Sequence, residues 1–245
     1  MITYKTPEEI EIMKIGGKIS ANALQIALDM AKEGVSLREI DSQVEAFILK
    51  NKAKPSFKSV PGYKYSTCIN INDGLVHGIP NNYIIKKGDL VKIDLGVLYD
   101  GFHTDTSATK EIGTDLEKKF IEAGKICIEN AIQKCQIGNK LGDVSHEMQI
   151  SIESKGYSVS RSLVGHGIGR KLHEDPLVPP YGKPGTGITL KEGLVLAIEI
   201  IYQKGNHHLK TLEDGWTIST KDGSLGGLCE HTVAITRKGP LVLTK

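Results

Sequence analysis

Residues 86–94 read K-K-G-D-L-V-K-I-D, and residues 191–199 read K-E-G-L-V-L-A-I-E. The two stretches align without a gap. In each, a glycine precedes a short hydrophobic strand that ends in isoleucine and a carboxylate, Asp94 in the first stretch and Glu199 in the second. This internal repeat predicts two related halves, each of which directs one acid from an equivalent strand toward a shared interface.

Helical patterns precede each copy of the repeat at a similar offset. Capping boxes at Thr6 and Ser36 predict two helices in the first half, and apolar periodicity predicts two more over about 115–135 and 143–156. The segment from Glu174 to Thr189, rich in proline and glycine, predicts an irregular loop. Short β-branched segments predict strands at 56–60, 68–72, 90–101, 106–112, 157–164, 193–202, 215–220 and 229–236. We therefore expect one α/β (α+β) domain over 1–245, with halves of about 1–112 and 113–245.

Composition narrows the class of protein. The 245 residues carry a formal net charge of +2, which is too mild for the clustered basic face of a nucleic-acid binder. Four cysteines without a C-x-x-C pair fit a reducing cytosol better than a disulfide framework. The start of the chain lacks the apolar core of a signal peptide, and no stretch is apolar enough to span a membrane. We expect a cytoplasmic protein with no membrane partner.

Four carboxylates lie inside segments that otherwise read as apolar strands: Asp94, Asp105, Glu199 and Glu230. Acidic residues are depleted in strands, and unpaired charges are almost never fully buried. Four carboxylates brought together repel one another and are costly to desolvate. Bound cations are the natural compensation, and two divalent ions would balance their charge.

Three histidines accompany these acids in glycine-rich segments. His77 lies in LVHGIP, while His166 and His173 flank HGIGRKLHE. Beside buried acids, such histidines become candidate ligands or general acid-base groups. Oxygen-rich sites with an imidazole suit Mn²⁺, Fe²⁺, Co²⁺ or Zn²⁺. The residues alone therefore predict a two-metal hydrolase and leave peptide and phosphate substrates both open. His103 and His231 adjoin the site and are expected to support it from outside.

Five segments resemble, in the right order, the signatures of type I methionine aminopeptidases in their short bacterial form: NDGLVHGIP, KIDLGVLYDGFHTDTS, VGHGIGRKLHEDP, LAIEI and CEHTVAIT. The resemblance implies the pita-bread fold, in which two pseudo-symmetric halves form a curved antiparallel sheet backed by helices. It also implies an enzyme that removes the N-terminal methionine from nascent proteins. In that family, a hydroxide that bridges two divalent metal ions attacks the scissile carbonyl.

The resemblance assigns a metal-binding role to five residues. It implies that Asp94 chelates one ion, that Asp105 and Glu230 bridge both ions, and that His166 and Glu199 hold the other. It further implies that Glu199 exchanges protons with the attacking hydroxide.

The resemblance also assigns residues that would contact the substrate. His77 would hydrogen-bond the scissile amide, and His173 would stabilise the carbonyl oxygen as charge develops on it. Tyr63, Cys68 and Trp216 align with positions that line the methionine pocket, and an aromatic and thiol lining suits a thioether. For Cys68, packing in the core is an equal alternative.

Three positions depart from the usual family pattern. Ile200 stands where a proline is common, Leu172 where an aromatic residue is common, and Val60 where a pocket tyrosine is common. None is a predicted ligand, so these departures bear on the width of the pocket and not on the chemistry. The family also implies a monomer that acts on nascent chains near the ribosome.

Three other functions compete with this interpretation. A proline-specific aminopeptidase or prolidase shares the fold but usually carries an extra N-terminal domain, whereas here the first helix is predicted from residue 7. A catalytically silent binding protein of this fold would typically lack metal ligands, and all five are present. A phosphatase would be expected to add a glycine-rich phosphate loop or an arginine clamp, and neither accompanies the acids.

Overall fold

The computed structural model describes residues 1–245 and contains four α-helices. Two of them begin at the predicted capping boxes: the Thr6 and Ser36 hydroxyls each accept a hydrogen bond from the backbone three residues on, and a glutamate side chain there bonds back. The third and fourth helices begin within three residues of their predicted starts. The helices are α1 (Pro7–Met30), α2 (Leu37–Lys50), α3 (Lys118–Lys134) and α4 (Leu141–Glu153).

The strands form one large antiparallel sheet and one small sheet. The large sheet has ten strands in the order β1-β4-β5-β12-β9-β7-β8, with β2 beside β4, β13 beside β12 and β6 beside β9. The small sheet has the order β10-β11-β3. The bounds are β1 (Lys54–Pro55), β2 (Thr67–Ile71), β3 (Gly74–Val76), β4 (Leu90–Tyr99), β5 (Phe102–Glu111), β6 (Ser158–Val159), β7 (Gly165–Gly167), β8 (Glu174–Val178), β9 (Val195–Gln203), β10 (Leu209–Thr211), β11 (Ile218–Thr220), β12 (Gly226–Thr236) and β13 (Gly239–Val242).

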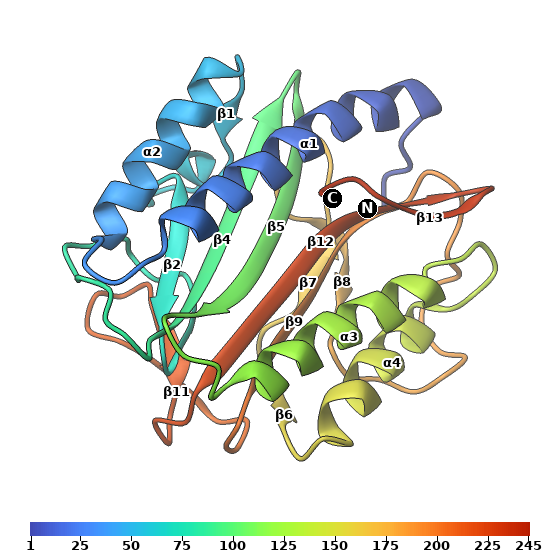
Figure 1. The fold of residues 1–245 in the computed structure, drawn as a ribbon. Coiled ribbons are helices and arrows are strands. Elements are labelled where there is room, and N and C mark those ends of the chain that lie inside the picture. Colours follow the sequence, from blue (N-terminus) through green and yellow to red (C-terminus); the bar gives the residue numbers. More distant parts are fainter.

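The strand order of the large sheet mirrors itself about its centre. Strands β5 and β12 pair there, β4 and β9 flank them, and the short strands β2 and β7 lie beyond. Helix α1 packs on β4 and β5, and α3 packs on β12 and β9. Figure 1 shows α1 with α2 over one half of the sheet and α3 with α4 over the other. The expectation of an antiparallel sheet backed by helices in two similar halves is confirmed.

In each of the two repeated strands, side chains alternate between the two faces of the sheet, and the acid lies on the face away from the helices. Ile93 on β4 packs into a core cluster with α1 and α2, while Ile198 and Ile200 on β9 pack into a cluster with α3 and α4. Successive side chains of a strand point to opposite faces. Asp94 and Glu199 therefore emerge together on the face of the sheet that the helices leave open.

One predicted strand is wrong. Residues 56–60 do not pair in a sheet, because residues Phe57–Ser59 form a 3-10 helix, η1. The backbone amide of Ser59 donates to the carbonyl of Ser56 at 2.9 Å, and the Ser59 hydroxyl donates to the same oxygen at 2.6 Å. The apolar Phe57 signals burial here, and the two serines close the turn that achieves it.

Two further predictions need correction around the second half. The strand predicted over 157–164 stops after Ser158–Val159, because the Ser160 hydroxyl accepts the backbone amide of Leu163 at 3.0 Å and turns the chain out of the sheet. The irregular loop predicted over 174–189 begins instead with strand β8, which pairs with β7. The predicted loop is correct only beyond Val178.

Candidate active site

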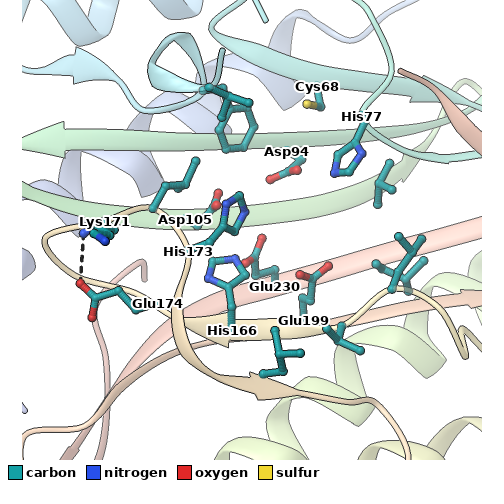
Figure 2. A pocket seen from close by; sticks show the side chains of 18 of the residues that line it. Cys68, His77, Asp94, Asp105, His166, Lys171, His173, Glu174, Glu199 and Glu230 are labelled. Atoms are coloured by element: carbon teal, nitrogen blue, oxygen red, sulfur yellow. Dashed lines mark hydrogen bonds between the residues drawn. The ribbon is translucent and has the colours of Figure 1, made fainter. Parts of the chain in front are cut away.

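Five cross-strand neighbours form one row across the large sheet. Cys68 on β2 pairs with Asp94 on β4, and Asp94 pairs on its other side with Ser107 on β5. Ser107 pairs with Glu230 on β12, which pairs in turn with Glu199 on β9. Directly paired residues share a face of the sheet, so these five side chains line up on the open face. Figure 2 shows the three acids of this row around a common space.

A second row supplies the remaining predicted ligands. Asp105 lies two residues before Ser107 on β5, and His166 on β7 pairs with Ala197, two residues before Glu199. Ligand atoms of Asp105, His166 and Glu230 all lie within 4.8 Å of one another, a separation suited to one metal ion. Asp94 and Glu199 lie outside this triad and line the same cavity.

The electrostatics of the acids fit bound cations. Asp105 and Glu230 are buried, and burial, followed by the neighbouring carboxylates, raises their pKa values well above the usual range. Burial also raises the pKa of Asp94 to about 7 and that of Glu199 to about 8. The Oδ1 atom of Asp94 is buried without a hydrogen-bond partner. A buried carboxylate without a partner destabilises the fold unless a cation compensates its charge. The four acids therefore fit as ligands of divalent metal ions.

His166 is oriented as a ligand should be. Its Nδ1 lies 2.9 Å from the carbonyl oxygen of Gly167, which can only accept, so Nδ1 carries the proton and Nε2 presents its lone pair. Burial, reinforced by His173, lowers the pKa of His166 to about 4, which keeps the ring neutral. The ring of His173 lies edge-on at 4.4 Å from that of His166.

His77 and His173 lie on the rim of the metal-ligand group. His77 directly follows β3 with a left-handed backbone (φ 58°), and Gly78 behind it has no space for a side chain against the Ile69 carbonyl. Burial lowers the pKa of both histidines, and for His77 the positive charge that a protonated His173 would carry lowers it further. Both rings are therefore neutral near pH 7. Figure 2 places His77 near Asp94, and His173 beside His166.

A cavity of about 910 Å³ joins these groups to a hydrophobic pocket. The rings of Tyr63 and Trp216 meet edge-to-face with centroids 5.1 Å apart, and Cys68 lies in the same buried cluster. An apolar wall of aromatic and thiol groups suits a flexible thioether. The cavity is lined by every residue that the sequence analysis placed in the site: Tyr63, Cys68, His77, Asp94, Asp105, His166, His173, Glu199, Trp216 and Glu230.

The three departures from the family pattern separate in space. Val60 and Leu172 line the cavity. Ile200 instead lies in the core cluster under α3 and α4, on the other face of β9. Only Val60 and Leu172 can therefore change the shape of the pocket directly. His103 and His231 do not line the cavity, and each has Nδ1 within hydrogen-bond distance of a hydroxyl, from Ser56 and from Thr244 respectively.

Sequence reasoning missed one part of the site. Met1, Thr3 and Glu174 also line the cavity, so the first residues of the chain contact the segment that follows His173. No local pattern announces a contact between residues this far apart in the sequence. The one available signal was Glu174 itself, an acid placed directly after a candidate catalytic histidine.

Residues 11–237, which make up most of the chain, match the model of metallopeptidase family M24. The chain belongs to metallopeptidase family M24. This M24 peptidase is 44% identical to the methionine aminopeptidase of Clostridium perfringens, over 100% of this chain and 99% of that protein. It is 41% identical to methionine aminopeptidase 1 of Bacillus subtilis, over 100% of both chains.

Solved structures agree with these relatives. The methionine aminopeptidase of Thermotoga maritima superposes on this M24 peptidase with a TM-score of 0.98 and 43% identity, over 100% of both chains. The prolidase of Pyrococcus furiosus gives a TM-score of 0.80 and 29% identity, and the match covers 65% of that chain. The proline-specific alternative therefore rests on a more distant likeness.

These findings confirm the predicted resemblance to methionine aminopeptidases, the pita-bread fold and a metallopeptidase hydrolase. Membership of this family implies the use of a divalent metal, which agrees with the triad of Asp105, His166 and Glu230. None of the helices combines the length and the apolar character that a membrane crossing needs.

Proposed function

We propose that the protein removes the N-terminal methionine from nascent polypeptides. The observation that carries this proposal is the single cavity in which a row of carboxylates adjoins an apolar pocket walled by Tyr63 and Trp216. The acids alone would suit several hydrolases, and the pocket alone would suit many apolar ligands. Their junction supports cleavage next to an apolar side chain, and the full-length likeness to methionine aminopeptidases supports methionine as that side chain.

Two divalent cations would be held by five residues. Asp105, His166 and Glu230 converge within 4.8 Å, and with Glu199 they would hold one ion. Asp94 would hold the second, which Asp105 and Glu230 would share with the first. The ligand types suit Co²⁺, Mn²⁺, Fe²⁺ or Zn²⁺. A bound pair of such ions supplies Lewis-acid activation of water and polarisation of a carbonyl.

The other polar residues would position the substrate and move protons. Glu199 would exchange a proton with the attacking water, for which its place at the end of the acid row is suited. The neutral ring of His77 would hydrogen-bond the scissile amide, and that of His173 would stabilise the carbonyl oxygen. Tyr63 and Trp216, with Cys68, would enclose the methionine side chain.

We further propose that the protein acts as a monomer in the cytoplasm, on chains that emerge from the ribosome. Residues 1–245 would form one catalytic unit with halves of about 1–112 and 113–245. The central pairing of β5 with β12 supports this division, because each half then contributes acids to the same row.

A peptide panel tests the proposed substrate. Protein stripped with a chelator is assayed with and without Mn²⁺ or Co²⁺ on matched Met-Ala, Leu-Ala and Ala-Pro peptides. We expect metal-dependent release of methionine alone. Cleavage of the Ala-Pro peptide would instead favour the proline-specific branch of the family, and no cleavage of any peptide despite bound metal would favour a silent binding protein.

A further inference from the structure

A buried ion pair joins the start of the chain to the segment that carries His173. The Nζ atom of Lys5 lies 2.6 Å from Oε2 of Glu174, and the two side chains are only 4% and 6% exposed. Glu174 directly follows His173 and begins strand β8. Charged pairs are rarely buried this deeply, because desolvation offsets much of their attraction.

The Glu174 carboxylate is fixed at both oxygens. The Thr3 hydroxyl donates to Oε2 at 2.5 Å, and the backbone amide of Lys171 donates to Oε1 at 3.0 Å. Lys5 also donates to the Thr3 hydroxyl at 2.8 Å, which closes a small network. Figure 2 shows the bond from Lys171 to Glu174, the residues on either side of the turn that carries His173. Every donor in this network therefore restrains the turn on which His173 lies.

The fold leaves a slot for Lys5. Its backbone amide donates to the Gly193 carbonyl at 2.7 Å. A side chain at Gly169 would overlap the Lys5 Cε atom, and one at Gly193 would overlap the Lys5 backbone. Gly169 is also tied to the site, because its carbonyl accepts the amide of His103 at 2.7 Å. Gly193 thus leaves room for the Lys5 backbone, and Gly169 leaves room for the end of the lysine side chain that reaches Glu174.

The other charged contacts of this segment are far more exposed. Arg170 pairs with Glu9 at 2.6 Å, but the arginine side chain is 67% exposed. Asp175 pairs with the amino group of Met1 at the surface. Exposed pairs hold geometry weakly, since water and salt compete for both partners. The buried pair of Lys5 and Glu174 is the contact able to fix the segment.

We propose that Lys5 is a positioning residue, which acts through Glu174 to hold the His173 ring in place against His166 and over the cavity. The inference rests on the proposed function, in which His173 contacts the scissile carbonyl. A displacement of about 1 Å in such a group costs on the order of 10²-fold in rate. Lys5 would therefore affect turnover without touching the substrate.

The kinetic test is a double-mutant cycle in Mn²⁺-loaded protein on a Met-Ala-Ser peptide. We expect Lys5→Met to lower kcat by at least ~10-fold with KM and bound Mn²⁺ little changed, and Lys5→Arg to restore most of the loss. In a His173→Ala background, Lys5→Met should change kcat by less than ~2-fold, because its target is gone. Losses that add in full would overturn the inference, as would an unchanged kcat in Lys5→Met.

Two further variants complete the design. Glu174→Gln keeps the shape and removes the charge, so it reports on the same contact if Lys5→Met does not fold. Glu9→Gln breaks the exposed pair with Arg170 while keeping an oxygen for the capping box, and it should leave kcat unchanged.

A readout independent of turnover separates this inference from the proposed function. In Zn²⁺-loaded protein, long-range ¹H–¹⁵N spectra report the histidine rings, and His173→Ala assigns the His173 signal. We expect that signal to shift in Lys5→Met and to stay in place in Glu9→Gln. An unmoved His173 signal in Lys5→Met overturns the positioning role. Failure of the wild-type protein to release methionine, by contrast, contradicts the proposed function alone.

Discussion

Glu199 on β9 and Glu230 on β12 are directly opposed in the sheet, and the row continues from Glu230 to Ser107 and Asp94. Like charges at paired positions destabilise a sheet, and their burial adds a further cost. A fold that places them there requires a compensating charge, which bound divalent cations supply. The opposed carboxylates thus destabilise the metal-free fold, and bound metal ions would offset that cost.

The Asp94→Asn variant should abolish peptide cleavage and weaken or remove one of the two bound Mn²⁺ ions. The substitution changes charge and ligand number more than shape, so circular dichroism should remain that of the wild type. Calorimetry with Mn²⁺ and an activity assay check both parts. Asp100→Asn makes the same change at the exposed β4–β5 turn and should leave both unchanged. A misfolded Asp94→Asn protein would mark Asp94 as structural.

The His77→Ala variant should lower kcat by ~10²-fold or more while two metal ions remain bound, as expected for a residue that hydrogen-bonds the reacting amide. His77 has a left-handed backbone, which alanine tolerates poorly, so His77→Asn provides a second variant that accepts this conformation. The exposed His208→Ala is the matched control. Loss of metal in both His77 variants would make this residue a ligand.

Metal binding should strengthen as the pH rises from about 6 to 8. Burial raises the pKa of Asp94 to about 7 and of Glu199 to about 8, so the metal-free folded protein holds protons that the unfolded chain has released. Metal-free stability therefore falls as pH rises through this window, whereas bound metal displaces the same protons. Thermal denaturation should show a larger increase in Tm on adding Mn²⁺ at pH 8 than at pH 6. An increase that is independent of pH would contradict the assignment of these acids as ligands.

A Val60→Tyr substitution should tighten the selection of methionine. Val60 lines the cavity beside the aromatic wall. A tyrosine ring in its place would narrow the pocket, so that an unbranched side chain fits and a branched one is excluded. The kcat/KM ratio of Met-Ala to Leu-Ala peptides should rise several-fold. Ile200→Val, on the helix side of β9, should leave that ratio unchanged. An unaltered ratio in Val60→Tyr would place the methionine side chain elsewhere in the cavity.

The sequence predicted the parts of the site that local periodicity encodes. Ile93 and Asp94, like Ile198 and Glu199, alternate between core and cavity, and this alternation can be read in the sequence itself. The capping boxes of α1 and α2 were predictable for the same reason, since all of their partners lie within three residues.

Contacts between distant segments were not predictable. The pairing of Lys5 with Glu174 joins residues 169 positions apart in the sequence, and each residue alone reads as ordinary surface charge. The turn at Phe57 was mistaken for a strand because burial and β-branching give the same signal in a short segment. In both cases the local sequence is compatible with more than one conformation or partner, and contacts with distant segments select the one observed.

In the proposed function, the acid row and the apolar pocket act together on a free N-terminal methionine. Mass spectrometry of a Met-Ala-Ser peptide and its N-acetylated form, each incubated with Mn²⁺-loaded protein, tests this most directly. We predict that the free peptide loses one methionine residue and that the acetylated peptide remains intact. Cleavage of the acetylated peptide, or of neither peptide, would rule out this joint action of the acid row and the pocket.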